Sequence, residues 1–194
     1  MHLNSLKLPI IEVKYYWVIF CMSKILPAWY SKSIYEIDID KLKELNIKYL
    51  LSDLDNTLVG CDMPTPTDKV FELIKNLKEK NIELIVISNN TGNRLNRFCE
   101  PVNVRYLAST GKPGSKKLLK YLKTNSIDVK ECAFVGDQLL TDMWCANKAG
   151  CVSILVDPLQ KKESIFTFFN RRIDRIIRNK YRKNNKLISI MKGE

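Results

Sequence analysis

Two hydrophobic periodicities alternate along the chain. From Thr67 to Lys80 apolar residues recur every three or four positions, which predicts an amphipathic helix. Short continuous apolar runs on either side of it predict strands that are buried on both faces. Strands separated by single helices indicate an α/β fold, a Rossmann-like parallel sheet with helices on both faces. The strands are expected at 47–52, 82–87, near 103–107, 132–135 and 151–156, and the further helices at 91–99, 114–124 and 138–148.

Polar side chains gather where these predicted strands end. Asp53 and Asp55 directly follow the first apolar run, and the two carboxylates of such a D-x-D pair share one face of an extended chain. Because the carboxyl ends of parallel strands meet at one edge of a sheet, we expect the polar residues that follow the later strands to join them. These later residues are Ser88 and Asn89, Lys112, and Asp137 and Asp142.

This set of side chains suits the cleavage of a phosphomonoester. The reaction requires an in-line nucleophile, a proton for the leaving oxygen and positive charge around the phosphoryl group. A carboxylate is ionised at neutral pH, so Asp53 is the predicted nucleophile, forming an aspartyl-phosphate, and Asp55 is the predicted general acid and base. Ser88, the main-chain amide of Asn89 and the ammonium group of Lys112 are predicted to bind the phosphoryl oxygens of the substrate.

The acidic residues also predict a magnesium site. Several carboxylates around an anionic phosphoryl group repel one another unless a hard cation lies between them. Asp53 and Asp137, with a main-chain carbonyl group at Asp55, are therefore expected to hold Mg²⁺. Asp142 either completes the outer shell of the metal or holds Lys112 in place, and its spacing does not choose between these roles.

Each motif has a plainer interpretation when it is taken alone. Ser88 could be the N-cap of the following helix, and Lys112 could be one solvated charge in a Lys-rich stretch. Asp137 could belong to a simple turn, with Asp142 on an exposed helix face. Only the joint order of the motifs favours a phosphoryl-transfer site.

That order resembles the haloacid dehalogenase (HAD) superfamily, which combines a D-x-D, a Ser or Thr, a Lys and an acidic G-D-x-x-x-x-D motif. Within the superfamily the chain is similar to YqeG-type phosphatases of subfamily IIIA. The likeness covers roughly residues 23 to 180 and implies the same roles for the site residues. The matching segments are Asp53 to Leu58, Ser88 to Asn90, Lys112 with Pro113, and Gly136 to Asp142.

The intervals between the motifs leave no room for a separate lid. Residues 59–81 accommodate a loop and one helix, and residues 91–111 accommodate one helix and one strand. We therefore expect a HAD fold without a large cap domain and an open site. In this superfamily an open site is typically associated with a macromolecule, a lipid headgroup at a surface, or a small substrate held by an oligomer.

The chain lacks residues that other hydrolytic mechanisms require. His2 is the only histidine, which excludes Ser-His-Asp hydrolysis and histidine-based zinc sites. Cys99 and Arg105 enclose five residues as in cysteine-dependent phosphatases, but Pro101 between them has no N–H for a phosphate-binding loop. The six cysteines form no C-x-x-C pair and indicate thiols in a reducing cytosol.

The two ends of the chain differ from the predicted HAD phosphatase core at 23–160. Residues 1–22 are interpreted as an N-terminal extension, with a membrane-surface anchor as the alternative, and their apolar run is too short to span a bilayer. Residues 161–194 hold eleven Lys or Arg and three acids, a net charge of +8 out of the total of +11. They predict a basic amphipathic C-terminal helix that could lie on anionic lipid, rest on RNA phosphates, or dock on the sheet with a solvated basic face.

Three functions remain in view. The first is a Mg²⁺-dependent phosphomonoester hydrolase that is cytoplasmic and peripheral at the inner face of the membrane. The HAD resemblance implies phosphatidylglycerophosphate, or another phosphate presented at a surface, as its substrate. The second is a ribosome- or RNA-associated accessory protein with a HAD fold, and the third is a phosphatase of a soluble metabolite or protein. No transmembrane helix is predicted.

Overall fold

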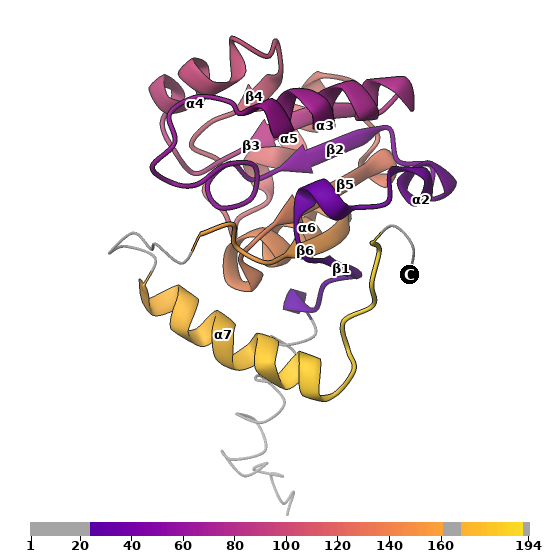
Figure 1. Ribbon diagram of the computed structural model, residues 1–194, viewed down its shortest axis with the longest axis vertical. Coiled ribbons are helices and arrows are strands. Elements are labelled where there is room, and N and C mark those ends of the chain that lie inside the picture. The colour runs from indigo at the N-terminus through magenta and orange to yellow at the C-terminus, as the bar shows by residue number, and fades with distance from the viewer. Residues whose placement is uncertain (1–23, 161–167, 192–194) are drawn as a thin grey trace, which may run out of the picture.

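The computed structural model describes residues 24–160 and 168–191, and in these residues six parallel strands form one sheet (Figure 1). The strand order is β1-β6-β5-β2-β3-β4. The parallel α/β sheet predicted from the hydrophobic pattern is therefore confirmed. The strands are β1 (Trp29–Ser31), β2 (Tyr49–Ser52), β3 (Glu83–Ile87), β4 (Arg105–Leu107), β5 (Cys132–Gly136) and β6 (Val152–Val156).

Helices connect the strands as the periodicity predicts, with one difference. The helix expected at 138–148 is split into a π-helical turn, η3 (Leu139–Met143), and a short α-helix, α6 (Trp144–Ala149). Such wide turns occur often at functional sites. The other α-helices are α2 (Ile39–Glu44), α3 (Asp68–Glu79), α4 (Gly92–Cys99), α5 (Lys116–Thr124) and α7 (Phe168–Lys183), and two short 3₁₀ helices are η1 (Ile34–Glu36) and η2 (Val129–Glu131).

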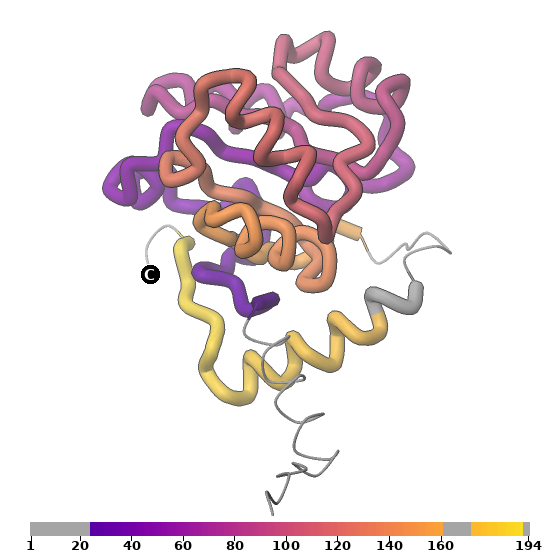
Figure 2. The backbone as a smooth tube through the Cα atoms, turned by 180° about the vertical axis from the view of Figure 1, so that it is seen from behind, coloured from indigo at the N-terminus to yellow at the C-terminus, as the bar shows by residue number. Residues whose placement is uncertain are grey.

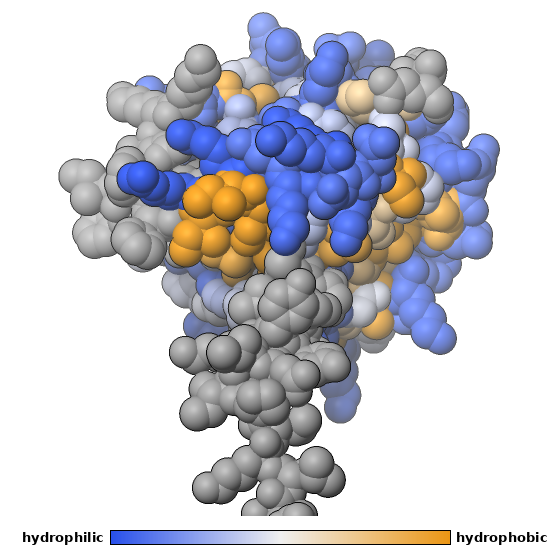
Figure 3. Space-filling view, turned by 90° about the horizontal axis from the view of Figure 1, so that it is seen from below, coloured by the Kyte–Doolittle hydropathy of each residue, from blue (hydrophilic) through white to orange (hydrophobic). Residues whose placement is uncertain are grey.

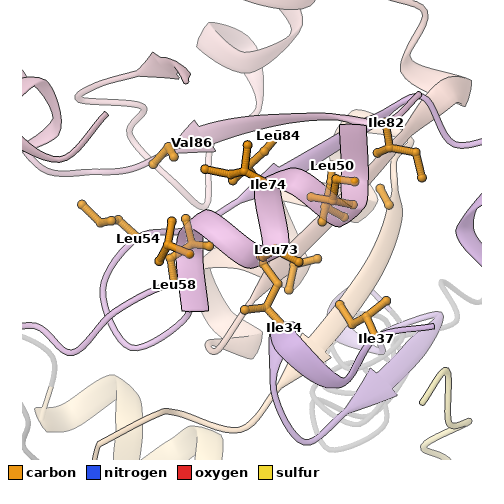
Figure 4. Close-up of a cluster of buried hydrophobic side chains, with 14 of the residues drawn as sticks. Ile34, Ile37, Leu50, Leu54, Leu58, Leu73, Ile74, Ile82, Leu84 and Val86 are labelled. Carbon is orange, nitrogen blue, oxygen red and sulfur yellow. The ribbon is translucent and has the colours of Figure 1, made fainter. Parts of the chain in front are cut away.

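The sheet divides the apolar core into two layers. Alternate strand residues face opposite sides, so Leu84 packs in the layer of α2, α3 and α4, whereas Ile85 packs in the layer of α5 and α6. Figure 4 shows Leu73 and Ile74 of α3 lying against the strand residues of the first layer. Figure 2 shows α5 and α6 covering the other face. Burying each of the large apolar side chains stabilises the fold by about 1.5–3 kcal/mol.

The edge of the sheet at β1 is covered by the C-terminal part of the chain. The N–H of Tyr30 in β1 donates to the carbonyl of Ile188 over 2.7 Å, and the N–H of Ile190 donates to the carbonyl of Tyr30 over 3.0 Å. Beneath this edge lies α7 (Figure 1), whose Ile177 and Tyr181 pack in a third apolar cluster with residues of η3 and β6. The C-terminal helix is thus docked on the core, one of the three placements considered from the sequence.

The inward face of α7 differs from its apolar sequence pattern. Apolar spacing points to Phe166, Phe169 and three isoleucines, but Ile176 is 65% exposed and Ile173 is also exposed. The side chains of Phe166 and Phe169, like the predicted extension at 1–22, lie outside the described residues. Among the side chains of α7 that the structure describes, from Arg172 to Lys183, the buried ones are Asp174, Arg178 and Tyr181. Two of these residues, Asp174 and Arg178, are charged. They are buried because their side chains bind main-chain groups of the loop that follows β5.

Candidate active site at the carboxyl edge of the sheet

The predicted site residues meet where the direction of the strand order changes. β2 is paired with β3 on one side and with β5 on the other, and the chain continues outward from both. Ligands of open α/β sheets bind at this switch point, outside the carboxyl ends of the strands. Asp53 directly follows β2, Asp137 directly follows β5, and Ser88 directly follows β3.

Lys112 joins two of these loops through a buried ion-pair network. Its Nζ lies 2.7 Å from Oδ1 of Asp53 and 2.7 Å from Oδ1 of Asp142, and it donates to the carbonyl of Ile87 over 3.0 Å. The Lys112 side chain is only 3% exposed, so the interpretation as a solvated surface charge is wrong. Asp142 is also buried rather than on an exposed helix face. Its contact with Lys112, one of the two alternatives that the spacing left open, is present.

Burial and charge shift the protonation equilibria of this network. Burial raises the pKa of Asp53 to about 7; the ammonium group of Lys112 opposes this shift, while the carboxylates of Asp142 and Asp137 add to it. Burial by itself would lower the pKa of Lys112, but Asp142 and Asp53 outweigh it and raise that pKa above its usual range. Lys112 is therefore protonated at neutral pH, and it holds the two acids.

Three carboxyl groups at this edge could hold a metal ion. Asp53, Asp137 and Asp142 each offer one carboxylate oxygen, and these oxygens lie within 4.8 Å of one another. All three residues are buried; burial is the main cause of the raised pKa of Asp53, and the carboxylates of Asp142 and Asp137 raise it further, a repulsion that a cation between them would relieve. Carboxylate oxygens are the ligands that Mg²⁺ prefers, so the residues present fit this ion.

The carboxyl group of Asp55 faces a different environment. Nε of Arg94 donates to Oδ1 of Asp55 over 3.1 Å, with a second contact from the guanidinium group, and the side-chain amide of Asn90 donates to Oδ2. Asn90 and Arg94 were not among the predicted site residues. One signal was available: α4 runs back from the end of β3, so its first turn must lie at the carboxyl edge.

Ser88 and Asn89, in the loop after β3, have different hydrogen-bond partners. The hydroxyl of Ser88 accepts from the N–H of Asn90 over 3.1 Å, which leaves its own hydrogen to donate to a ligand. The helix begins later, with Thr91 at its N-cap, so the interpretation of Ser88 as the helix cap is wrong. Asn89 holds the main chain of Lys112: its Oδ1 accepts from the Lys112 N–H over 2.8 Å, and its Nδ2 donates to the Lys112 carbonyl over 3.1 Å.

Gly136 allows Asp142 to approach the end of β5. A Cβ atom at Gly136 would lie 2.4 Å from Cβ of Asp142 and 2.6 Å from its Oδ2. This Oδ2 accepts from the N–H of Gln138 over 3.0 Å. The glycine of the G-D-x-x-x-x-D motif is thus required by the packing of the second acid against the strand.

Two residues of α7 bind the main chain of the same loop. Asp174 accepts from the N–H of Leu139 over 2.8 Å and from the N–H of Leu140 over 3.3 Å. Arg178 donates to the carbonyl of Asp137 and, over 3.1 Å, to the carbonyl of Val156. The segment carrying Asp137 and Asp142 is therefore held from outside the motif. No local sequence signal pointed to these contacts, because they join segments about 35–41 residues apart.

The cysteine motif rejected from the sequence has no nucleophilic thiol. Cys99 is buried on α4, and burial raises the pKa of its thiol to about 12. Arg105 is paired with Glu83 on the neighbouring strand, with Nη2 2.7 Å from Oε2. The buried cysteines Cys99, Cys132, Cys145 and Cys151 are free thiols.

Comparison with known proteins places this geometry in a family. Residues 12–160 match the family described as mitochondrial PGP phosphatase. The chain belongs to this family. The match begins inside the segment 1–22 and stops before α7. The chain is also 36% identical over 152 residues to the probable phosphatase YqeG of Bacillus subtilis, covering 78% of this chain and 88% of that protein. The resemblance to HAD phosphatases is confirmed, and the chain is an enzyme of that type.

Solved structures with a similar chain trace share less sequence identity with this chain. An uncharacterized protein from Listeria monocytogenes serotype 4b is 18% identical, with a TM-score of 0.49, and the alignment covers 61% of this chain and 85% of that chain. The cobalt-bound deoxy-D-mannose-octulosonate 8-phosphate phosphatase of Haemophilus influenzae is 16% identical, with a TM-score of 0.48, covering 71% of this chain and 90% of that chain. Likeness at this level does not bear on the reaction or the substrate. No helix within residues 24–160 and 168–191 has the length and apolar character needed to cross a bilayer.

Proposed function

We propose that the enzyme hydrolyses a phosphomonoester through a covalent phosphate on Asp53, with phosphatidylglycerophosphate or another surface-presented phosphate as its substrate. The observation that carries this proposal is the buried contact of Lys112 with both Asp53 and Asp142 at the switch point of the sheet. A nucleophile needs a fixed direction, and this contact fixes one oxygen of Asp53 while leaving the other to attack.

The reaction divides into two balanced steps. In the first, a carboxylate oxygen of Asp53 attacks phosphorus, the phosphorus–oxygen ester bond breaks, and the leaving oxygen takes a proton from Asp55. In the second, water attacks the phosphorus of the aspartyl-phosphate and gives a proton to Asp55. Inorganic phosphate leaves and the Asp53 carboxylate re-forms. Lys112 and the hydroxyl of Ser88 stabilise the negative oxygens throughout, aided by the main-chain amide of Asn89.

Mg²⁺ is the proposed cofactor. Asp53 and Asp137 would hold it with the main-chain carbonyl of Asp55, and Asp142 lies near enough to take part. When bound, the ion would neutralise charge on the phosphoryl oxygens. The donor set supports this choice, because it consists of oxygen atoms only and three of its members are buried carboxyl groups.

The outer face of α7 supports a substrate presented at an anionic membrane surface. Arg172, Arg175 and Lys180 are exposed, and the exposed Ile173 and Ile176 lie among them. Figure 3 shows hydrophilic residues gathered over this side of the molecule beside apolar ones. Each basic residue near anionic lipid contributes about 1 kcal/mol, and interfacial helices combine basic with apolar residues in this way. Exposed isoleucines favour lipid over RNA, which offers no apolar layer.

Vesicle assays test the substrate. Phosphate release from vesicles containing phosphatidylglycerophosphate should require Mg²⁺ and disappear in Asp53→Asn. Turnover of soluble phosphates alone would contradict the proposed substrate and favour a metabolite or protein phosphatase. No Asp53-dependent release from any phosphomonoester would contradict the proposed reaction.

A charge-matched pair of variants tests the surface. Arg172→Ser/Arg175→Ser/Lys180→Ser should weaken binding to phosphatidylglycerol vesicles roughly 100-fold, because three basic contacts are lost. The control removes three exposed charges from α5, whose Leu118 and Leu122 pack in a different apolar cluster from that of α7: Lys116→Ser/Lys120→Ser/Lys123→Ser. Equal weakening of vesicle binding in both variants would show that binding depends on net charge and not on the position of these residues on α7. Salt-dependent binding to ribosomes, unchanged in Asp53→Asn, would instead favour the RNA-associated role.

A further inference from the structure

The site contains a second cation, whose situation differs from that of Lys112. The Arg94 side chain is 24% exposed, against 3% for Lys112, and its ion-pair partner is Asp55. Lys112 has two buried acids as partners, whereas the Asp55 side chain is itself 28% exposed. Arg94 therefore lies at the mouth of the site, with about a quarter of its side chain open to solvent.

The position of Arg94 is tied to the leaving group through Asp55. A group that protonates the leaving oxygen must come within hydrogen-bond reach of it. The atoms of the substrate just beyond that oxygen must then lie beside the guanidinium group of Arg94, which contacts the same carboxylate through Nε and a second nitrogen. Arginine offers five donors in a planar fork that matches the oxygens of a phosphate.

The observed contacts also restrain Asp55. Arg94 donates to one of its oxygens and Asn90 donates to the other, so both oxygens of the carboxylate are engaged. A carboxylate held in this way accepts hydrogen bonds and does not donate a proton. A substrate group that takes over the guanidinium of Arg94 would release Asp55 for its role at the leaving oxygen.

We propose that Arg94 binds a second anionic group of the substrate, on the leaving-group side, and that this group replaces Asp55 as the partner of the guanidinium. In the substrate already proposed, the alcohol portion carries a phosphodiester one short linker from the phosphomonoester, and Arg94 is then the residue that binds this second phosphate. This inference rests on the proposed function, since it assigns Asp55 to the leaving-group side. It names Arg94 as the residue that distinguishes such substrates from simple phosphomonoesters.

Two soluble ligands separate this role from any effect of a membrane. Glycerophosphoglycerol phosphate, the deacylated headgroup of phosphatidylglycerophosphate, carries a phosphodiester and a terminal phosphomonoester. Glycerol 3-phosphate carries the phosphomonoester alone. Their affinities for full-length Asp53→Asn protein can be measured by calorimetry with Mg²⁺, so the comparison does not depend on turnover. The preference is the ratio of the two dissociation constants.

Arg94→Gln added to Asp53→Asn should reduce the preference for the two-phosphate ligand about 10-fold to 100-fold, because a charge-assisted bidentate contact is lost. Arg94→Lys should retain part of it, since the charge stays but the fork is lost. Arg97→Gln, an exposed arginine on the same helix, is the matched control and should leave the preference within twofold. Thermal unfolding of each variant shows whether it is folded.

Two outcomes would overturn the inference: an equal loss of affinity for both ligands in Arg94→Gln, or no preference before the substitution. Hydrolysis by the protein with Asp53 intact is a separate readout. A chain that binds the two-phosphate ligand through Arg94 but never hydrolyses it would contradict the proposed function and leave this inference standing. Hydrolysis of both ligands at equal KM would contradict this inference and leave the proposed function standing.

Discussion

Asp53 and Asp55 are two positions apart in the sequence, yet they belong to two different regions of the site. Asp53 is part of a buried region with Lys112, Asp137 and Asp142, and its side chain is 10% exposed. Asp55 belongs to a mouth region with Asn90 and Arg94 and is 28% exposed. The alternation of side chains along the chain brings both acids to the same sheet edge, but the neighbouring loops give them different partners.

The difference matches what the two proposed roles require. A nucleophile must keep one orientation, and buried contacts with fixed partners supply it. A residue that passes protons between a leaving group and water must reach both, so it needs partners that can be exchanged. The ion pairs of the buried region should also matter more for the stability of the fold than the ion pair of the mouth region. Breaking a buried ion pair leaves an uncompensated charge, whereas a partly exposed pair contributes little to stability.

Lys112→Met should have the largest effect, because it leaves Asp53 and Asp142 buried without their cation. We expect a loss of about 3–5 kcal/mol in the free energy of unfolding, together with loss of phosphatase activity. Denaturant unfolding and phosphate release measure the two effects. Lys112→Met/Asp142→Asn is the control: it should recover part of the stability but none of the activity. Wild-type stability in Lys112→Met would contradict the buried network.

Asp174 extends the buried region to α7 and should make stability depend on pH. Burial raises its pKa to about 6, although the Leu139 amide and the Arg178 guanidinium oppose this. An acid whose pKa is raised by folding favours the folded state when it is protonated. Its contribution is fully present below pH 3.8 and is lost as pH rises through 6.

The stability of wild type relative to Asp174→Asn should therefore fall by up to roughly 3 kcal/mol over this pH range, since one pKa unit corresponds to about 1.36 kcal/mol. Urea unfolding of both proteins at several pH values gives the difference. Asn cannot titrate but can still accept the bond from Leu139, so it isolates the charge. A constant difference between the two proteins would contradict the assigned burial of Asp174.

Mg²⁺ should stabilise the buried region by relieving its acidic repulsion. At an ion concentration 100 times the dissociation constant, we expect about 2.7 kcal/mol of added stability. Thermal unfolding with Mg²⁺ or with EDTA measures this directly, without any substrate. Asp137→Asn should lose most of the gain, whereas Asp128→Asn, at an exposed turn away from this edge, should keep it. Equal stabilisation of both variants would place the ion elsewhere.

Arg94→Gln should have the smallest effect on stability, despite its place in the site. Its pair with Asp55 is partly exposed, and such pairs contribute about 0–1 kcal/mol. Urea unfolding should therefore change by less than about 1 kcal/mol. A loss as large as that of Lys112→Met would mean that the mouth region is a structural network like the buried one.

Local sequence patterns were enough to predict what lies on the strands. The apolar runs located five of the six described strands, and their polar ends brought Asp53, Ser88 and Asp137 to one edge. β1 was missed because Trp29–Ser31 lies between Pro27 and the polar residues Lys32 and Ser33 and is not part of a longer apolar run. Its pairing with β6, more than 120 positions away, is what makes it a strand.

The partners of the site residues were harder to predict. Arg94 faces Asp55 across 39 positions, and Asp174 meets Leu139 across 35, so neither contact has a local signature. On α7 the apolar pattern mispredicted which residues are buried. Asp174 and Arg178 are buried there because they bind main-chain groups of the loop after β5. Contacts of this kind depend on how the finished elements pack.

The central claim is that Asp53 forms the covalent intermediate while Asp55 handles protons. The most direct test is acid quenching of wild type and Asp55→Asn during turnover of a phosphomonoester with Mg²⁺, followed by borohydride reduction and peptide mass analysis. We predict that the acyl phosphate lies on Asp53, which reduction converts to homoserine, and that Asp53→Asn gives no such product. A phosphate attached to any other residue, or steady turnover in Asp53→Asn, would contradict the account.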